Sequence, residues 1–186
     1  MSDIIESWKH VDGYEGNYSV SNLGRVRNER SGRVSKPSTN RKGYHVVNLS
    51  VNGKPKTHQV HRLVALAFVN NTDPERRNQV DHIDGVRVHN IASNLRWATN
   101  SENQRNGRGF SFHNGKPTSS SYKGVSFDQS RGKWLACIQI GNKTRSLGRF
   151  TSEEAAARAY DAAALEMFGD YARLNFPSND EQSYPV

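Results

Sequence analysis

Three side chains between residues 80 and 103 have the types and spacing that metal-dependent hydrolysis requires. Asp81 and His82 are adjacent, and Asn103 follows later in the same segment. A neutral imidazole, with an ordinary pKa near 6.5, can take a proton from water, so His82 is a candidate general base. The oxygens of Asp81 and Asn103 are hard ligands that favour Mg²⁺ or Mn²⁺ over Zn²⁺. We therefore expect one divalent ion per active site, with water and substrate oxygens completing its coordination.

The elements expected around these residues are two short strands followed by a helix. The segment Gln79–Thr99 predicts two strands joined by a long connection, and Asn100 stands in a favourable N-cap position for the helix. Because side chains alternate in direction along a strand, Asp81 and His82 can serve one site only where the strand ends or bends. An apolar face predicts a further, largely buried helix over His58–Val69.

Several other polar and aromatic residues have simpler interpretations. Asp84 precedes Gly85 and is interpreted as a turn former. Five further histidines are interpreted as surface or hydrogen-bonded residues: His10, His45, His58, His89 and His113. The three tryptophans, Trp8, Trp97 and Trp134, are expected in the core.

The remaining segments predict short strands and one long helix. Trp8–Val51 predicts antiparallel strands, and Phe110–Ser121 has the composition of a linker. Three β-like runs follow, at Tyr122–Phe127, Lys133–Ile140 and Thr144–Phe150, and Thr151 opens a helix with Glu154 completing a capping box. Strict alternation turns Trp134, Ala136, Ile138 and Ile140 toward this helix and Lys133, Leu135, Cys137 and Gln139 away from it. One side of the small sheet is thus left for a ligand.

Composition points to a polyanionic partner. The 186 residues include 26 Lys and Arg against 18 Asp and Glu, a net charge of +8. Two stretches, Arg25–Lys56 and Ser111–Phe150, each contain a single acid, which suits contact along duplex DNA. The lone Cys137 excludes a disulfide framework and a multi-thiolate zinc site. Without an apolar run of membrane-spanning or signal-peptide length, we expect an intracellular, cytoplasmic protein that needs no membrane.

The segment His61–Asn103 resembles the HNH endonucleases, which have a ββα-metal active site. His82, Asn94 and Asn103, 12 and 9 residues apart, match the three positions that name the motif. As in the homing-type members, the last position is Asn and an acid precedes the first His. The resemblance implies that Asn94 braces the loop and orients His82, whereas Asp81 and Asn103 hold the metal.

Two further resemblances cover the ends of the chain. Glu6–Asn28, with Gly13-Tyr14-Glu15-Gly16 and Gly24-Arg25-Val26, resembles the N-terminal module of phage- and intron-encoded HNH homing endonucleases. Tyr122–Pro177 is similar to the Apetala2 (AP2) or ethylene-response-factor domain, in which a three-stranded sheet reads the major groove. The chain has a cation at Lys123 but Ser126, Asp128 and Gln139 where plant members commonly have Arg, so the fold is expected without the plant target sequence.

Together these features predict an α+β protein. Its expected parts are a basic β-rich module (1–56), a ββα-metal nuclease core (57–109), a linker (110–121), an AP2-like three-stranded antiparallel sheet packed on one helix (122–178) and a tail (179–186). The expected activity is metal-dependent hydrolysis of a phosphodiester bond at a specific duplex site in DNA, by nicking, for a phage or mobile element. The alternative is a sequence-specific DNA-binding regulator with an inactive nuclease site, and no feature identifies a protein partner. The expected DNA contacts are Arg25, Arg27, Arg41, Lys42, Lys54, Lys56, Arg62, Arg96, Lys123, Arg131, Lys133, Gln139, Lys143 and Arg145.

Overall fold

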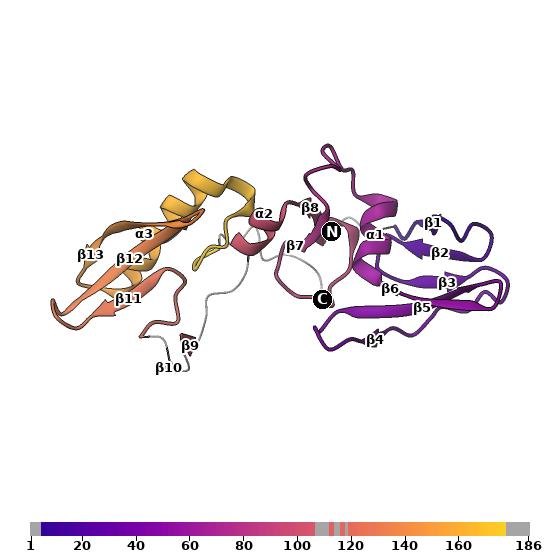
Figure 1. Cartoon of the computed structure of the whole chain (residues 1–186), viewed down its shortest axis with the longest axis horizontal. Coiled ribbons are helices and arrows are strands. Elements are labelled where there is room, and N and C mark those ends of the chain that lie inside the picture. Colours follow the sequence, from indigo (N-terminus) through magenta and orange to yellow (C-terminus); the bar gives the residue numbers. More distant parts are fainter. Residues whose placement is uncertain (1–4, 107–111, 114–115, 118, 178–186) are drawn as a thin grey trace. The chain divides into compact units, whose positions relative to one another are not determined.

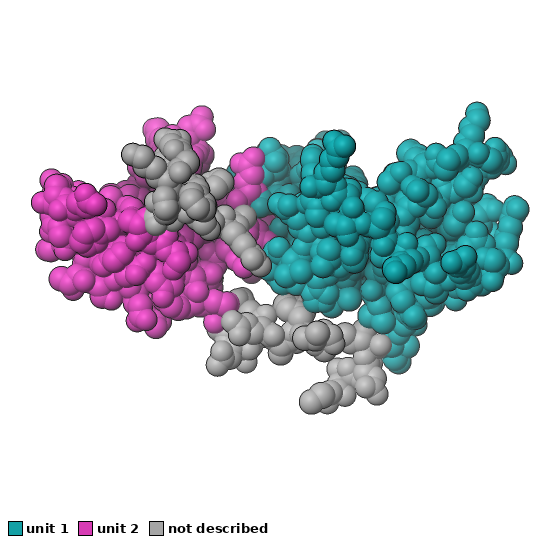
Figure 2. Space-filling model, turned by 90° about the horizontal axis from the view of Figure 1, so that it is seen from below, with its two compact units in different colours: residues 1–103 teal, residues 104–186 magenta. Residues whose placement is uncertain are grey.

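The computed structural model describes residues 5–106, 112–113, 116–117 and 119–177. The predicted tail and parts of the predicted linker lie outside these residues. The chain forms two compact units, residues 1–103 and 104–186, shown in teal and magenta in Figure 2. Among the described residues, none of the helices has both the length and the apolar character that a membrane span requires. The predicted α+β class is confirmed.

The first unit begins with two small antiparallel sheets (Figure 1). One contains β1 (Trp8–His10), β2 (Tyr18–Ser21) and β3 (Val26–Asn28), and the other contains β4 (Ser38–Thr39), β5 (His45–Val51) and β6 (Lys54–Gln59). The turn between β2 and β3 contains Gly24, whose φ of +81° is readily adopted only by glycine. A Cβ at Gly24 would lie 3.0 Å from both Cβ and the carbonyl oxygen of Asn90, so this turn packs directly against a loop far along the sequence.

The ββα unit predicted from the sequence is present. Helix α1 (Val60–Phe68) precedes the antiparallel pair β7 (Gln79–His82) and β8 (Leu95–Ala98), with the short helix η1 (Ala92–Asn94) in the connection. Helix α2 (Asn100–Arg105) follows. Its N-cap lies one residue earlier than predicted and forms a capping box: Thr99 Oγ1 accepts from the backbone N–H of Glu102 at 3.1 Å, and Glu102 Oε2 accepts from that of Thr99 at 2.7 Å. Asn100 is therefore not the N-cap residue.

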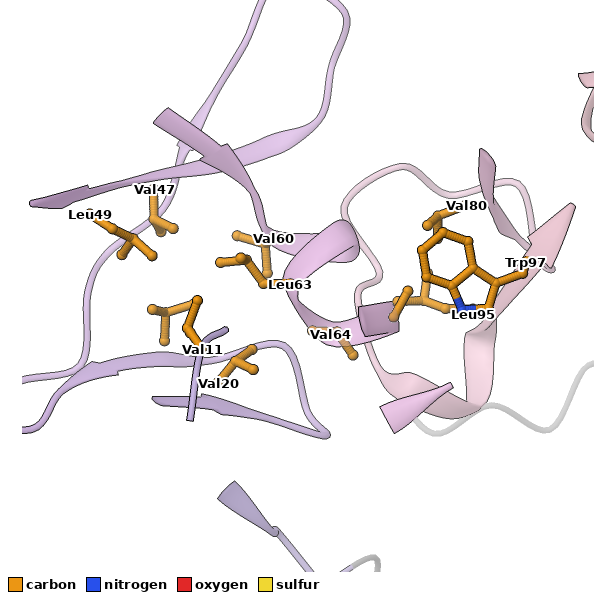
Figure 3. Close-up of a cluster of buried hydrophobic side chains, with 12 residues drawn as sticks. Val11, Val20, Val47, Leu49, Val60, Leu63, Val64, Val80, Leu95 and Trp97 are labelled. Atoms are coloured by element: carbon orange, nitrogen blue, oxygen red, sulfur yellow. The ribbon is translucent and has the colours of Figure 1, made fainter. Parts of the chain in front are cut away.

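One hydrophobic core joins the N-terminal sheets, α1 and the β7–β8 pair. Figure 3 shows side chains from the N-terminal sheets, from α1 and from the β7–β8 pair in a single cluster. It includes Val20, Leu49, Val64 and Trp97, so the expected boundary at residues 56 and 57 does not separate two compact units. Burial of this apolar surface is the main force that fixes the N-terminal sheets on the ββα unit.

Trp8 was predicted in this core but lies outside it. Its indole is half-buried, with the guanidinium carbons of Arg27 and Arg25 at 4.3 and 5.5 Å from the ring centroid. Trp97 is buried as predicted, and its Nε1 donates to the carbonyl oxygen of Val69 at 3.0 Å.

The second unit contains the predicted three-stranded sheet and its helix. The strands are β11 (Val125–Asp128), β12 (Lys133–Ile140) and β13 (Lys143–Phe150), followed by α3 (Glu153–Phe168) and η2 (Gly169–Tyr171). The N-cap of α3 is Ser152 rather than Thr151, because Ser152 Oγ accepts from the N–H of Ala155. A short hairpin, β9 (Phe112–His113) and β10 (Lys116–Pro117), falls within the predicted linker.

Packing of α3 fixes which face of the sheet is covered. Ala136 and Ile138 are buried against α3, Trp134 packs at the edge of the cluster, and Ile140 is 41% exposed and so lies beyond the covered region. A register shift between Ala136 and Cys137 places Arg145 opposite Ile138 and Arg149 opposite Leu135. Because residues opposite one another point to the same face, Arg145 lies on the helix side and Arg149 on the open side.

The segment that follows η2 is hydrogen-bonded to α3 and to the backbone just before β11. Asp161 accepts hydrogen bonds from the backbone N–H groups of Asn175 and Phe176 at 2.8 and 2.9 Å. Asn175 in turn exchanges two hydrogen bonds with the backbone of Lys123, at 2.7 and 3.1 Å. These bonds hold the backbone next to Gly124. A Cβ at Gly124 would lie 2.0 Å from Cδ2 of Tyr160, so only glycine fits at this position.

Candidate active site and nucleic-acid interface

Asp81 lies near the end of β7 and is paired with a residue of the neighbouring strand. The register places Arg96 directly opposite Asp81, and Arg96 Nε and Nη2 lie 2.8 and 2.7 Å from Asp81 Oδ2. The side chain of Arg96 is only 15% exposed. Arg96 was predicted to contact DNA; the structure instead has its guanidinium holding the Asp81 carboxylate, since a buried carboxylate needs such compensation.

His82 is the last residue of β7, where the chain turns away from the strand. The turn is closed by hydrogen bonds from Gly85 N to His82 O and from Ile83 N to Asn94 O, of 2.8 and 2.9 Å. His82 is 4% exposed, and its Nε2 lies 3.1 Å from Asn90 Oδ1. Burial lowers the pKa of His82 below its ordinary value, although the contact with Asn90 opposes this shift. The side chain is therefore neutral at physiological pH, as a general base must be.

A second buried histidine packs against His82. The ring centroids of His61 and His82 lie 5.1 Å apart at an interplanar angle of 69°, and Tyr44 lies 4.8 Å from His61 on the other side. Burial lowers the pKa of His61 to about 3, and His82 and Arg62 contribute to the shift. Nδ1 of His61 is buried and has no hydrogen-bond partner among the described residues. His61 thus presents a neutral, rigid ring to His82.

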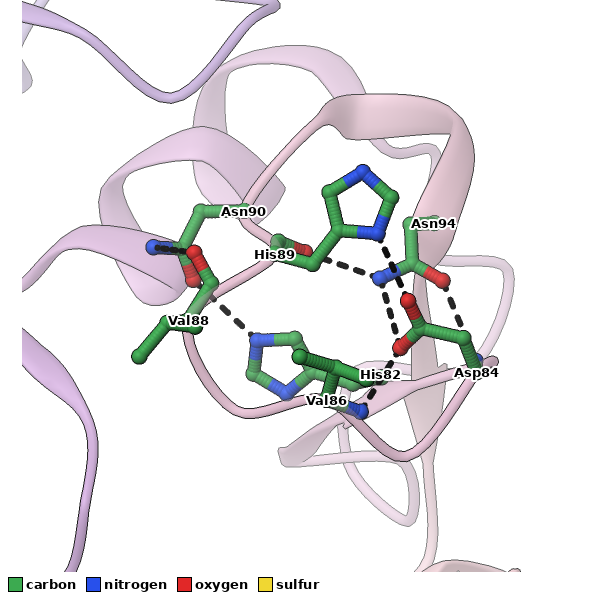
Figure 4. A network of polar contacts seen from close by, with 7 residues as sticks. All are labelled: His82, Asp84, Val86, Val88, His89, Asn90 and Asn94. Atoms are coloured by element: carbon green, nitrogen blue, oxygen red, sulfur yellow. Dashed lines mark hydrogen bonds and ion pairs between the residues drawn. The ribbon is translucent and has the colours of Figure 1, made fainter. Parts of the chain in front are cut away.

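The loop between β7 and β8 is held by a polar network, shown in Figure 4. Asn94, fully buried, accepts from the N–H of Asp84 at 3.1 Å and donates to Asp84 Oδ1 at 3.0 Å and to the carbonyl of His89 at 2.8 Å. His89 Nδ1 lies 2.6 Å from Asp84 Oδ2. Burial opposes ionisation of Asp84, but its bonds with His89, Val86 and Asn94 outweigh that effect and lower its pKa. Asn94, at the end of the loop that follows His82, therefore holds the start of that loop at Asp84 and its middle at His89 in place.

Asn103 lies in α2, which begins soon after β8 ends. Its side chain is half-exposed, and its backbone N–H donates to Thr99 O at 3.0 Å. Among the described residues, no group of three or more His, Cys, Asp or Glu side chains has the arrangement of a metal site. One carboxylate and one amide oxygen are donors of the kind that a hard ion takes together with water and phosphate oxygens, whereas Zn²⁺ sites are built mainly from His and Cys.

Many of the basic residues predicted to contact DNA are exposed in the first unit. Arg41, Lys42, Lys54 and Lys56 lie at the surface of the β4–β6 sheet and its turns. Arg25 and Arg27 are instead engaged with Glu6 and Glu29. Arg62 is half-buried, with its Nη1 donating to Asn78 O at 3.2 Å.

On the second unit, register defines the open face of the sheet. It contains Ser126, Asp128, Lys133, Leu135, Cys137, Gln139, Thr144, Ser146 and Arg149. Lys133 and Gln139 are on this face as predicted, but Lys143 and Arg145 are on the face of Ile138 and Ile140. The ammonium of Lys123, also a predicted DNA contact, donates to Arg105 O, and burial, with Arg173, lowers its pKa to about 8.

Arg149 and Arg131 meet at one carboxylate on the open face. Arg149 Nε lies 3.0 Å and Arg131 Nη1 3.3 Å from Asp128 Oδ2. Hydrogen bonds from Ser130 and Arg149 hold the pKa of Asp128 below its usual range. The Asp128 carboxylate thereby orients the Arg149 guanidinium on the face opposite α3.

Comparison with known proteins agrees with this geometry. Residues 6–50 match the NUMOD4 motif and residues 120–170 match the AP2 domain. The chain is 46% identical over 99 residues to DNA endonuclease I-HmuI of Bacillus phage SP01, an alignment that covers 53% of this chain and 56% of I-HmuI. A solved structure of I-HmuI, described as showing DNA binding and cleavage by an HNH homing endonuclease, matches with a TM-score of 0.50 and 44% identity, covering 54% of this chain and 56% of that one.

Parts of the chain are thus similar to HNH homing endonucleases and to the AP2 domain.

Two further relatives are each similar to one part of the chain. An HNH endonuclease, L245, of Acanthamoeba polyphaga mimivirus is 43% identical over 54% of this chain and 29% of its own length. Ethylene-responsive transcription factor ERF010 of Arabidopsis thaliana is 48% identical over 30% of this chain and 31% of its own length. The chain thus spans little more than half the length of the endonuclease I-HmuI, and a smaller share of the lengths of L245 and ERF010.

Four residues around these sites were missed or underrated by sequence reasoning. Asp84 is more than a turn former, because it also binds His89 and Asn94. His89 was interpreted as an ordinary polar residue, and Asn90 received no role. Arg149 was absent from the predicted DNA contacts. The available signal was that His89 and Asn90 are adjacent polar residues in the connection between the two predicted strands, shortly after His82.

Proposed function

We propose that this protein is a metal-dependent DNA endonuclease of the HNH homing type that hydrolyses one phosphodiester bond at a specific duplex site. The main support is the arrangement at the end of β7, where Asp81 and His82 are both 4% exposed, together with the 46% identity of 99 residues of this chain to a DNA endonuclease. One such unit per chain would cut one strand per encounter, which gives a nick.

In this proposal each side chain has a distinct role. His82 takes a proton from the attacking water, for which its lowered pKa keeps it ready at neutral pH. Asp81, held by Arg96, and Asn103 bind one Mg²⁺ or Mn²⁺, which would supply positive charge beside the phosphate. Asn94 keeps the loop closed and the backbone after His82 in place.

Duplex DNA is the proposed partner of both units. The exposed Arg41, Lys42, Lys54 and Lys56 would contact phosphates near the nuclease site. The open face of the β11–β13 sheet would read bases, as the similarity to AP2 domains suggests. Since the endonuclease relatives come from a phage and a virus, we propose that the protein acts on DNA inside the cell.

Relaxation of supercoiled plasmid tests the proposal. The full-length protein should nick with Mg²⁺ or Mn²⁺ and stop when a chelator is added. Asp81→Ala and Asn103→Ala should each abolish nicking and leave DNA binding largely intact, whereas Asp12→Ala, which removes an exposed acid, should nick normally. Near-wild-type nicking by Asp81→Ala would reject the metal assignment. A wild-type protein that binds a specific duplex but never nicks it would favour the DNA-binding regulator instead.

A further inference from the structure

Asn90 connects the N-terminal sheets to the nuclease loop. Its amide makes three contacts: Oδ1 to His82 Nε2 at 3.1 Å, Nδ2 to Val88 O at 3.1 Å and Nδ2 to His45 Nδ1 at 3.4 Å. Asn90 is 5% exposed, so water cannot substitute freely for these partners.

The chemistry of these contacts fixes the orientation of the amide. A backbone carbonyl can only accept hydrogen bonds, so the atom of Asn90 that faces Val88 O must be the NH₂ group. The opposite orientation would bring two acceptor oxygens within 3.1 Å of each other. The carbonyl oxygen of Asn90 therefore faces His82.

The same reasoning assigns the proton on His82. Because Asn90 Oδ1 can only accept, Nε2 of His82 must be the donor, which places the single proton of the neutral imidazole on Nε2. Nδ1 is then the nitrogen that carries the basic lone pair. A histidine in the other tautomer would turn a hydrogen atom toward the water it is meant to deprotonate.

The backbone around Asn90 is fixed by the N-terminal module. Gly24 packs against Cβ and the carbonyl oxygen of Asn90, and the N–H of Ala92 donates to Asn22 O at 2.7 Å. His45, on β5, supports the amide from the other side. The sheets matched by the NUMOD4 motif thus contribute directly to the surroundings of His82.

We propose that Asn90 is a positioning residue that holds His82 in the Nε2–H tautomer and leaves Nδ1 as the general base. This inference rests on the proposed role of His82 in the nuclease reaction. The N-terminal module then has a second task besides any contact with DNA, because it holds Asn90 where the amide can select the tautomer.

Three variants of the full-length protein separate positioning from folding. Asn90→Leu keeps the approximate volume but cannot accept a hydrogen bond, and Asn90→Asp keeps an acceptor oxygen for His82 but loses the donor to Val88 O. Asn71→Leu is the matched control, since Asn71 likewise bonds local backbone, donating to Arg77 O at 2.8 Å and accepting from Asp73 N at 3.2 Å. We expect Asn90→Leu to lower kcat by about 10- to 100-fold with little change in KM, the usual loss for a residue that orients a functional side chain. Asn90→Asp should recover part of the rate relative to Asn90→Leu, since the acceptor for His82 is restored and the donor to Val88 O is not, and Asn71→Leu should lose little.

Nitrogen NMR of the histidine rings supplies a readout that does not depend on activity. The His82 signals are assigned by their absence from the spectrum of His82→Gln. In the wild-type protein at pH 8 they should show a protonated Nε2 and an unprotonated Nδ1. Asn90→Leu should show a mixture of tautomers or the reverse one. A wild-type Nδ1–H tautomer, or an Asn90→Leu variant with an unchanged tautomer and kcat, would overturn the inference. If His82→Gln nicked at the wild-type rate, the base assignment would fail, and the NMR result would still decide whether Asn90 selects the tautomer.

Discussion

Arg96 binds Asp81 through two nitrogens that converge on a single carboxylate oxygen, Oδ2, across the β7–β8 pair. Both side chains are largely buried, at 15% and 5% exposure. The pair therefore links the proposed metal ligand to the strand that leads into α2. It also explains how an isolated acid is tolerated next to the hydrophobic core.

Removing Arg96 should destabilise the protein and abolish activity without a specific loss of DNA affinity. Arg96→Met leaves the Asp81 carboxylate buried without its guanidinium, and breaking a buried ion pair costs about 3–5 kcal/mol. Urea unfolding of the full-length variant measures this loss. The double variant Asp81→Leu/Arg96→Met should regain stability but not nicking. If Arg96→Met were as stable as the wild-type protein and bound DNA weakly, Arg96 would be a DNA contact after all.

The dependence of nicking on pH should reveal His82. A general base works only when deprotonated, so the rate should rise with pH and level off once the imidazole has lost its proton. Because burial lowers the pKa of His82, the rise should be centred below the ordinary value of 6.5. His82→Ala should lose about two powers of ten in rate, with no recovery at high Mg²⁺ concentration. Recovery by excess metal would mean that His82 acts by holding the ion.

His61 should make the folded protein sensitive to acid. Its pKa is about 3 in the folded state and near 6.5 when unfolded, so the unfolded chain binds one more proton between these values. Stability contributed by His61 is full above pH 6.5 and falls by up to about 1.4 kcal/mol per pH unit as the pH decreases toward 3. His61→Phe should flatten this slope, as measured by urea unfolding between pH 7 and pH 4. An unchanged slope would show that other groups cause the acid sensitivity, and His10→Phe, at an exposed site, serves as the control.

The α+β class and the ββα order could be predicted because they depend on local patterns. The spacing of His82, Asn94 and Asn103 coincides with a strand end, a short helix and a helix start, each with its own sequence signal. Capping was off by one residue at Thr99 and at Ser152, because neighbouring residues at both sites can accept the same hydrogen bond.

The features that the sequence did not reveal depend on contacts between distant segments. The ion pair of Arg96, a predicted DNA contact, was not foreseen because nothing near Arg96 in the sequence shows that Asp81 lies opposite, 15 residues earlier. Asn90 depends on Gly24 and His45, which come from another part of the chain. Arg145 and Arg149 have the same parity along β13, and only the register shift between Ala136 and Cys137 puts them on opposite faces. A bulge of this kind leaves no pattern in the alternation of residue types.

We therefore expect Arg149 to recognise a base, and we expect Lys143 to make no distinction between bases. Asp128 accepts from Nε of Arg149, which leaves the four N–H groups on Nη1 and Nη2 in the donor arrangement that matches O6 and N7 of guanine. Lys143 is exposed on the other face and carries only a point charge.

Binding by full-length variants to the mapped cleavage site and to random duplex distinguishes these roles. Arg149→Met should lose about 1–3 kcal/mol on the cognate duplex and less on random DNA, so that preference for one base pair relaxes. Arg149→Lys should restore nonspecific affinity but not the preference, because an ammonium cannot form the paired contact. Lys143→Met should lower the affinity for the cognate and the random duplex by the same factor. If Arg149→Met weakened both duplexes equally and reduced the salt slope by about 1, Arg149 would contact only a phosphate, and base reading would have to come from Lys133, Gln139 or the first unit.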